Sequence, residues 1–72
     1  MGPQIYRLEV EGELSDEFGQ LFEGMVLRHD HGNTVIVGVV RDQAELHGLL
    51  QRCANLGLTL MSVDTIDPKA QH

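Results

Sequence analysis

The sequence predicts an α+β fold, a two-layer sandwich in which a four-stranded antiparallel sheet carries two helices on one face. Three observations lead to this prediction. Four segments show the alternating or continuous apolar pattern of strands. Two segments between them have apolar residues at helical spacing, each behind a capping residue. The resulting order, β-α-β-β-α-β, divides into two β-α-β units whose right-handed crossovers give the strand order 4-1-3-2.

The first strand is predicted over residues 4 to 11, where Tyr6, Leu8 and Val10 alternate with polar residues. The first helix is predicted to follow, with Ser15 as its N-cap and Gly24 just past its C-terminal end. Four apolar residues of this segment would share one helical face, namely Leu14, Phe18, Leu21 and Phe22.

Residues 25–31 and 34–40 are predicted to form a hairpin around a two-residue turn at positions 32 and 33. This turn would place His29 opposite Ile36. The second strand of the hairpin is apolar on both faces, which is typical of a central strand covered on both sides.

The second helix is predicted to begin after Asp42, which with Glu45 forms an Asp variant of the capping box, and to end at Gly57. Gly48 inside this helix costs about 1 kcal/mol relative to Ala, for which a close packing contact is one explanation. The apolar stripe of this helix comprises Leu46, Leu49, Leu50, Cys53 and Leu56.

The last strand is predicted over residues 58–66. Two alternating sets, Leu58 with Leu60 and Met61 with Val63, compete for the buried face, so a β-bulge is expected. The complete layout is the ferredoxin-like one. We expect a single domain over residues 1–72, with an ordered core over about 4–67 and a frayed tail over 68–72.

Two helices on one side cover only one face of the sheet, yet the hairpin is apolar on both. We assign the face that carries the odd-numbered valines of the second hairpin strand to the outside. This face would then form an exposed apolar patch of roughly several hundred Å², a size at which such patches are typical of interaction sites. Because two identical patches can cover each other around a two-fold axis, a homodimer is the simplest partner arrangement. A dimer would also help a chain of 72 residues, which is short for a stable core. The predicted interface residues are Ile5, Arg7, Val26, Arg28, Val35, Val37 and Val39.

The chain is acidic, with 5 basic and 11 acidic residues and a formal net charge of −6. Its few cationic residues are scattered, which argues against nucleic acid and anionic membranes as partners. Cys53 is alone, which fits a reducing compartment, and the N-terminus has no apolar core of signal-peptide length. We therefore expect a cytoplasmic protein.

Candidate reactive residues are few. His29 and His31 would share a strand face at i, i+2, a spacing at which imidazoles bind zinc or copper. The alternative is that both are polar surface residues at the end of the hairpin. Cys53 lies on an apolar stripe and is interpreted as a small hydrophobic residue. His47 has no acid or nucleophile beside it in the sequence. We predict no catalytic residues and no cofactor, and favour a non-enzymatic protein.

Two resemblances accompany this interpretation. The segments 34–38, 42–50 and 56–63 resemble short bacterial proteins of unassigned function, a likeness that covers most of the chain from Gly24 onward. Separately, Gly12-Glu13-Leu14 is similar to the Gly-x-Leu part of the first loop of ACT domains, although Glu11 stands where those domains usually have Pro.

The leading hypothesis is a self-associating interaction or assembly module, a homodimer through the outer sheet face. The ACT resemblance implies an alternative, a regulatory module that binds a small molecule near Gly12, Glu13 and Leu14 at a subunit edge. A small metal-binding protein that uses His29 and His31 is a further alternative.

Overall fold

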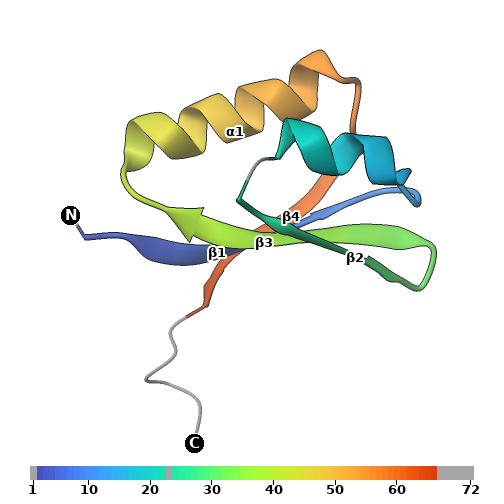
Figure 1. Cartoon of the computed structure of the whole chain (residues 1–72), viewed down its shortest axis with the longest axis horizontal. Coiled ribbons are helices and arrows are strands. Elements are labelled where there is room, and N and C mark those ends of the chain that lie inside the picture. The colour runs from blue at the N-terminus through green and yellow to red at the C-terminus, as the bar shows by residue number, and fades with distance from the viewer. Residues whose placement is uncertain (1, 23, 67–72) are drawn as a thin grey trace, which may run out of the picture.

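The computed structural model describes residues 2–22 and 24–66. Four strands form one antiparallel sheet in the order β2-β3-β1-β4 (Figure 1), which is the strand order expected from the sequence. One 3-10 helix and one α-helix connect them. In chain order the elements are β1 (Gln4–Val10), η1 (Asp16–Leu21), β2 (Val26–Asp30), β3 (Asn33–Val40), α1 (Gln43–Asn55) and β4 (Leu60–Ile66).

The predicted ferredoxin-like fold with two α-helices is wrong, because the segment after β1 forms the 3-10 helix η1. Its hydrogen bonds run three residues back, from Phe18 N to Ser15 O at 3.0 Å and from Phe22 N to Gly19 O at 3.3 Å. Ser15 occupies the N-cap position without a side-chain bond. A segment of six residues with a glycine inside it offers too few α-helical bonds to offset the cost of helix nucleation.

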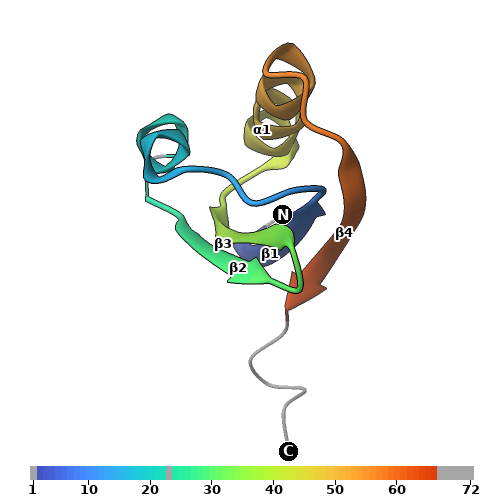
Figure 2. The same cartoon turned by 90° about the vertical axis from the view of Figure 1, so that its right-hand side faces the viewer.

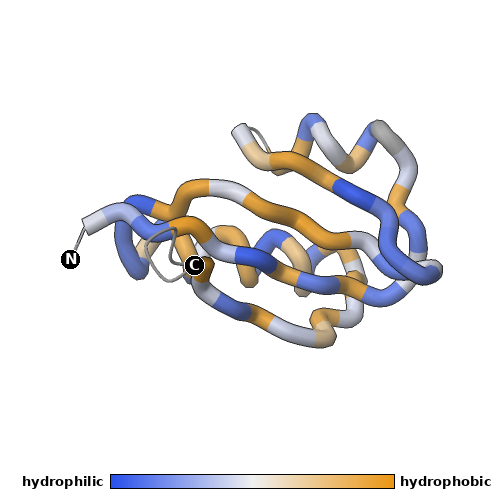
Figure 3. The backbone as a smooth tube through the Cα atoms, turned by 90° about the horizontal axis from the view of Figure 1, so that it is seen from below, coloured by the Kyte–Doolittle hydropathy of each residue, from blue (hydrophilic) through white to orange (hydrophobic). Residues whose placement is uncertain are grey.

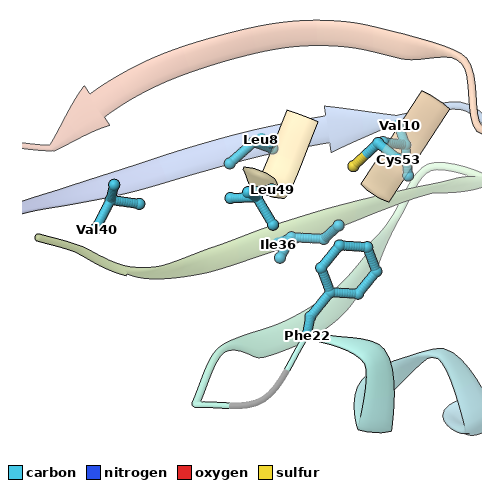
Figure 4. Close-up of a cluster of buried hydrophobic side chains, with 7 residues drawn as sticks. All are labelled: Leu8, Val10, Phe22, Ile36, Val40, Leu49 and Cys53. Atoms are coloured by element: carbon cyan, nitrogen blue, oxygen red, sulfur yellow. The ribbon is translucent and has the colours of Figure 1, made fainter. Parts of the chain in front are cut away.

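The helical segments lie on one side of the sheet (Figure 2). η1 lies above the β2 side, α1 lies above the middle of the sheet and packs on β3, and β4 forms the far edge. Between the two layers, one cluster of buried side chains forms the core (Figure 4), with Phe22 from the end of η1 reaching toward Ile36. The cluster comprises Leu8, Val10, Phe22, Ile36, Val40, Leu49 and Cys53.

The ends of α1 are as the sequence predicts. The Asp42 side chain accepts a hydrogen bond from Glu45 N at 2.8 Å, as the predicted capping box requires, whereas the Glu45 carboxylate accepts its bond from Arg41 N, at 2.8 Å, instead of from Asp42 N. At the other end, Gly57 has φ +74° and its N–H donates to Ala54 O, while Leu58 N donates to Cys53 O. These two bonds form a Schellman motif, which satisfies carbonyls that the end of a helix leaves free.

The hairpin turn lies one residue earlier than predicted. His31 and Gly32 both have positive φ, 52° and 84°, as a two-residue hairpin turn of the I′ kind requires. The β2–β3 register is therefore shifted by two residues, and His29 pairs with Thr34 rather than with Ile36. Because side chains alternate with period two, this shift leaves the paired residues of β2 and β3 on the faces assigned from the sequence, whereas His31 lies in the turn instead of in a strand.

The expected bulge is confirmed in β4, where the pairing with β1 shifts between Glu9 and Val10. Val63 pairs with Leu8 and therefore faces the helices, whereas Asp64 pairs with Arg7 and faces the outside. The predicted tail over 68–72, together with residue 67, lies outside the described residues.

Candidate functional site

The outer face of the sheet, on the side away from α1 and η1, carries the residues predicted to form an interface. The register places their side chains in rows that cross the strands. One row runs Val26, Val37, Arg7, Asp64, and the next runs Arg28, Val35, Glu9, Ser62. A third row contains Val39, Ile5 and Ile66.

The outer face combines exposed valines with charges of both signs. Val26 is 55% exposed and Val39 is 54% exposed, although both belong to strands of the sheet. Val35 is buried, at 6%. Figure 3 shows the sheet from this side, with apolar stretches of the backbone interrupted by polar positions. No described element covers this face (Figure 1), and the side chains of Val26 and Val39 meet solvent there.

The charges on this face are nearly balanced. Two arginines, Arg7 and Arg28, lie among three carboxylates, Glu9, Asp30 and Asp64. Arg7 Nη1 is 3.7 Å from Glu9 Oε1. Within the face the twisted sheet leaves a shallow hollow of about 560 Å³ lined by valines and by both arginines. The arrangement suits contact with a surface that is itself apolar with charges of both signs.

The first loop, where a ligand is predicted from the ACT resemblance, is bonded to the hairpin. Thr34 is fully buried, and its hydroxyl donates to Gly12 O at 2.8 Å and accepts from Leu14 N at 2.9 Å. Gly12 N donates to Asn33 Oδ1 at 3.2 Å. His29 Nε2 lies 2.8 Å from Leu14 O, which accepts its proton. The backbone N–H and C=O of both Gly12 and Leu14 thus have partners within the chain.

The two histidines proposed as metal ligands occupy different settings. His29 lies in β2 and bonds the first loop, whereas His31 lies in the turn with its side chain 93% exposed. His31 Nδ1 is 2.6 Å from an Asp30 carboxylate oxygen. Among residues 2–22 and 24–66, no group of three or more His, Cys, Asp or Glu side chains is arranged to hold a metal ion.

Cys53 is buried in the core cluster, at 2% exposed. Burial raises the pKa of its thiol, and the nearby positive charge of Arg52 opposes this shift only in part. A thiol of raised pKa is a poor nucleophile at neutral pH, which agrees with its interpretation as a small hydrophobic residue.

A second hollow, of about 460 Å³, lies between α1 and the end of η1. Phe22, Met25 and Leu49 contribute apolar lining, and Gly48 borders it from α1. Arg52 crosses from α1 to donate a hydrogen bond to Leu21 O. The packing contact considered for Gly48 is absent, because a Cβ at this position would meet nothing within 4 Å.

Several features of the structure were not predicted from the sequence. The hydroxyl of Thr34 and the side-chain amide of Asn33 bond the first loop. The sequence indicated this role only through the position of these two polar residues beside the hairpin turn. Ile66 lies on the outer face beside Ile5, which follows only from the β1–β4 register. In β4, three apolar side chains remain exposed, namely Leu60, Met61 and Val63.

The fold defines an α+β domain with one α-helix and a 3-10 helix over one face of a four-stranded antiparallel sheet. Residues 5–64 match the family described as a domain of unknown function, DUF8691, and the chain belongs to that family. No curated protein and no solved structure matches the chain significantly. In the part of the chain that the structure describes, one α-helix and one 3-10 helix stand where an ACT-like layout has two α-helices, so the structure does not support the similarity to ACT domains. None of the helices in the described part of the chain has the length and apolar character needed to cross a membrane.

Proposed function

We propose that this chain is a non-enzymatic self-association module and that two copies meet through the outer face of the sheet. The observation that carries the proposal is the exposure of Val26 and Val39 on a face that no described element covers. Apolar side chains gathered on one face gain free energy when a second surface removes them from water.

The size of the core supports a partner of this kind. Among residues 2–22 and 24–66, eight hydrophobic side chains are buried. A core of this size supplies little net stability once conformational entropy is subtracted, and small domains commonly gain the remainder by association. Burial of the outer valines would contribute in the same way.

The mixed charges on the outer face favour a second copy of the chain over a partner whose surface carries charge of a single sign. The chain as a whole has a formal net charge of −6, whereas this face carries two arginines and three carboxylates. Around a two-fold axis, an arginine of one copy can meet a carboxylate of the other. Two such sheets pack face to face at about 30°, with their side chains interdigitated.

The test is sedimentation or native mass spectrometry of wild type and of a double variant, Val26→Lys with Val39→Lys. Both positions are more than half exposed in the single chain, so the variant is expected to fold. Two lysines in an apolar contact would have to be desolvated, which should raise the Kd for face association at least about tenfold. The matched control is Leu21→Lys, at an exposed apolar position on η1 away from this face, which should leave the Kd unchanged.

Two results would contradict the proposal. One is a wild-type protein that stays an 8.0 kDa monomer up to millimolar concentration. The other is a double variant whose Kd and assembly mass equal those of wild type.

A further inference from the structure

The two edges of the sheet differ in how well they are protected from further strand pairing. β2 and β4 are the edge strands. β2 has five residues and three of them are Arg28, His29 and Asp30. β4 has seven residues, of which only Asp64 is charged. Charged side chains and short length are the usual means by which edges avoid pairing, so β4 is the more open edge.

The bulge in β4 does not close this edge. It lies at one end of the strand, where the pairing shifts between Glu9 and Val10. From Ser62 to Ile66 the strand pairs regularly with Ile5–Glu9 of β1. Five consecutive residues therefore keep ladder geometry, and those of their backbone groups that point away from β1 are available to another strand.

The helix-side face of β4 is only partly covered. α1 packs on β3, and β4 lies beyond it at the far edge of the sheet (Figure 2). Val63 faces the helices but is 37% exposed, and the bulge residue Met61, which has no partner in β1, is 53% exposed. Neither belongs to the apolar residues that pack against the core cluster. β4 thus combines an open backbone edge with apolar side chains in solvent.

We propose that β4 is a second contact surface, at which the β4 strands of two copies pair antiparallel and extend the sheet to eight strands. The sequence of β4 suits a short pairing when the two-fold axis passes through Val63, because residues 62–64 of both copies keep ladder geometry there and the bulge residue Met61 lies just beyond them. The Val63 side chains of the two copies then lie side by side on the helix side. On the outer side, Asp64 of each copy lies opposite Ser62 of the other. A pairing centred on Asp64 would instead place two carboxylates side by side, which is unfavourable. This self-complementarity identifies the occupant as a second copy of the chain.

The edge contact uses a surface distinct from the outer face. Its two-fold axis is perpendicular to the sheet, whereas the axis of a face-to-face contact lies parallel to the sheet. Where the two axes intersect, both contacts form in one closed assembly of four chains with three perpendicular two-fold axes. The edge contact stands on β4 alone and does not require the face contact.

The test uses opposite charges at the centre of the edge contact. In Val63→Lys, the Cβ atoms of two lysines would lie about 5 Å apart across the axis, which brings two positive charges together. In Val63→Glu, the same spacing would bring two carboxylates together. Each variant alone should raise the Kd for edge pairing at least about tenfold. An equimolar mixture, with one variant labelled with nitrogen-15, should form mixed pairs in native mass spectrometry. Val63→Thr, which keeps a β-branched side chain without charge, is the control and should pair like wild type.

Recovery in the mixture separates a lost contact from a failure to fold, because two unfolded chains do not rescue each other. The inference is overturned if Val63→Lys assembles like wild type, or if folded Val63→Lys and Val63→Glu do not form mixed pairs.

Combination with the outer-face variant separates the two contacts. If both contacts form, wild type is a four-chain assembly, and either Val63→Lys or the Val26→Lys, Val39→Lys double variant reduces it to a dimer. A wild-type dimer lost only with Val63→Lys supports the edge contact and contradicts the face contact. A wild-type dimer lost only with the double variant contradicts the edge contact.

Discussion

Thr34 connects the first loop to the hairpin through one buried hydroxyl group, which bonds Gly12 O and Leu14 N. In Thr34→Val both partners lose their bond at a buried site, so we expect the free energy of unfolding to fall by about 1–3 kcal/mol. Urea denaturation measures this change. In hydrogen exchange, the Leu14 amide should lose protection in Thr34→Val and keep it in Thr34→Ser, and equal protection in the two variants would contradict the assignment.

Gly38 in β3 is required by a neighbouring side chain. A Cβ at this position would lie 2.4 Å from Met25 Cγ, which is too close for the side chain to remain in place. We expect Gly38→Ala to lower the free energy of unfolding by about 1–3 kcal/mol, as overpacked cores do, measured by urea denaturation. Met25→Ala in the same chain should remove most of the penalty, and additive effects of the two changes would count against this explanation.

Cys53 should make stability depend on pH in the alkaline range. Burial raises the pKa of its thiol above the ordinary value of 9.0 in the folded state. The folded state therefore holds the proton more tightly, so its contribution is complete below the pKa of the unfolded thiol and is lost as pH rises through the folded pKa. The difference in unfolding free energy between wild type and Cys53→Ala should shrink between neutral pH and about pH 10. A difference that is constant with pH would show that this thiol is not perturbed.

At the scale of single elements, α1 contains a glycine that packing does not require. A Cβ at Gly48 would meet nothing within 4 Å, and its φ is not positive. Gly48→Ala should therefore raise the free energy of unfolding by about 0.5–1 kcal/mol, because alanine loses less backbone entropy in a helix. Thermal or urea denaturation measures the gain. A lower free energy of unfolding in Gly48→Ala would reveal a contact at this position. Gly38→Ala serves for comparison, because there the free energy of unfolding is expected to fall.

The elements differ in how far local sequence determines them. α1 was predictable with its caps, because Asp42, Glu45 and Gly57 act within one turn of the helix. β1, β2 and β3 have the inward and outward faces predicted from the sequence, whereas the sequence left the faces of β4 open. η1 was not predictable, since the apolar spacing of Leu14, Phe18 and Phe22 fits an α-helix. Its six residues cannot sustain one, and the segment is held by contacts distant in sequence, such as the bond from Arg52 to Leu21 O.

At the scale of the whole molecule, association should appear as stability that depends on concentration. Assembly that stabilises only the folded state raises the Tm as protein concentration rises. We expect this rise for wild type, and a smaller rise for Val63→Lys and for the Val26→Lys, Val39→Lys double variant. Calorimetry over a wide range of concentration measures it. A Tm that is independent of concentration in wild type would contradict both proposed contacts.

The sequence by itself determined the number of strands and their order along the chain, the inward and outward residues of the hairpin, and α1 with both of its ends. Each of these depends on periodicity or on interactions within a few residues, which the order of amino acids specifies directly. Only the tertiary structure decided the rest. It placed Thr34 beneath the first loop, moved the hairpin turn to His31 and Gly32, and left Val63 exposed at an open edge. These features depend on strand register and on which surfaces the helices cover, and both are set by the packing of segments far apart in the chain.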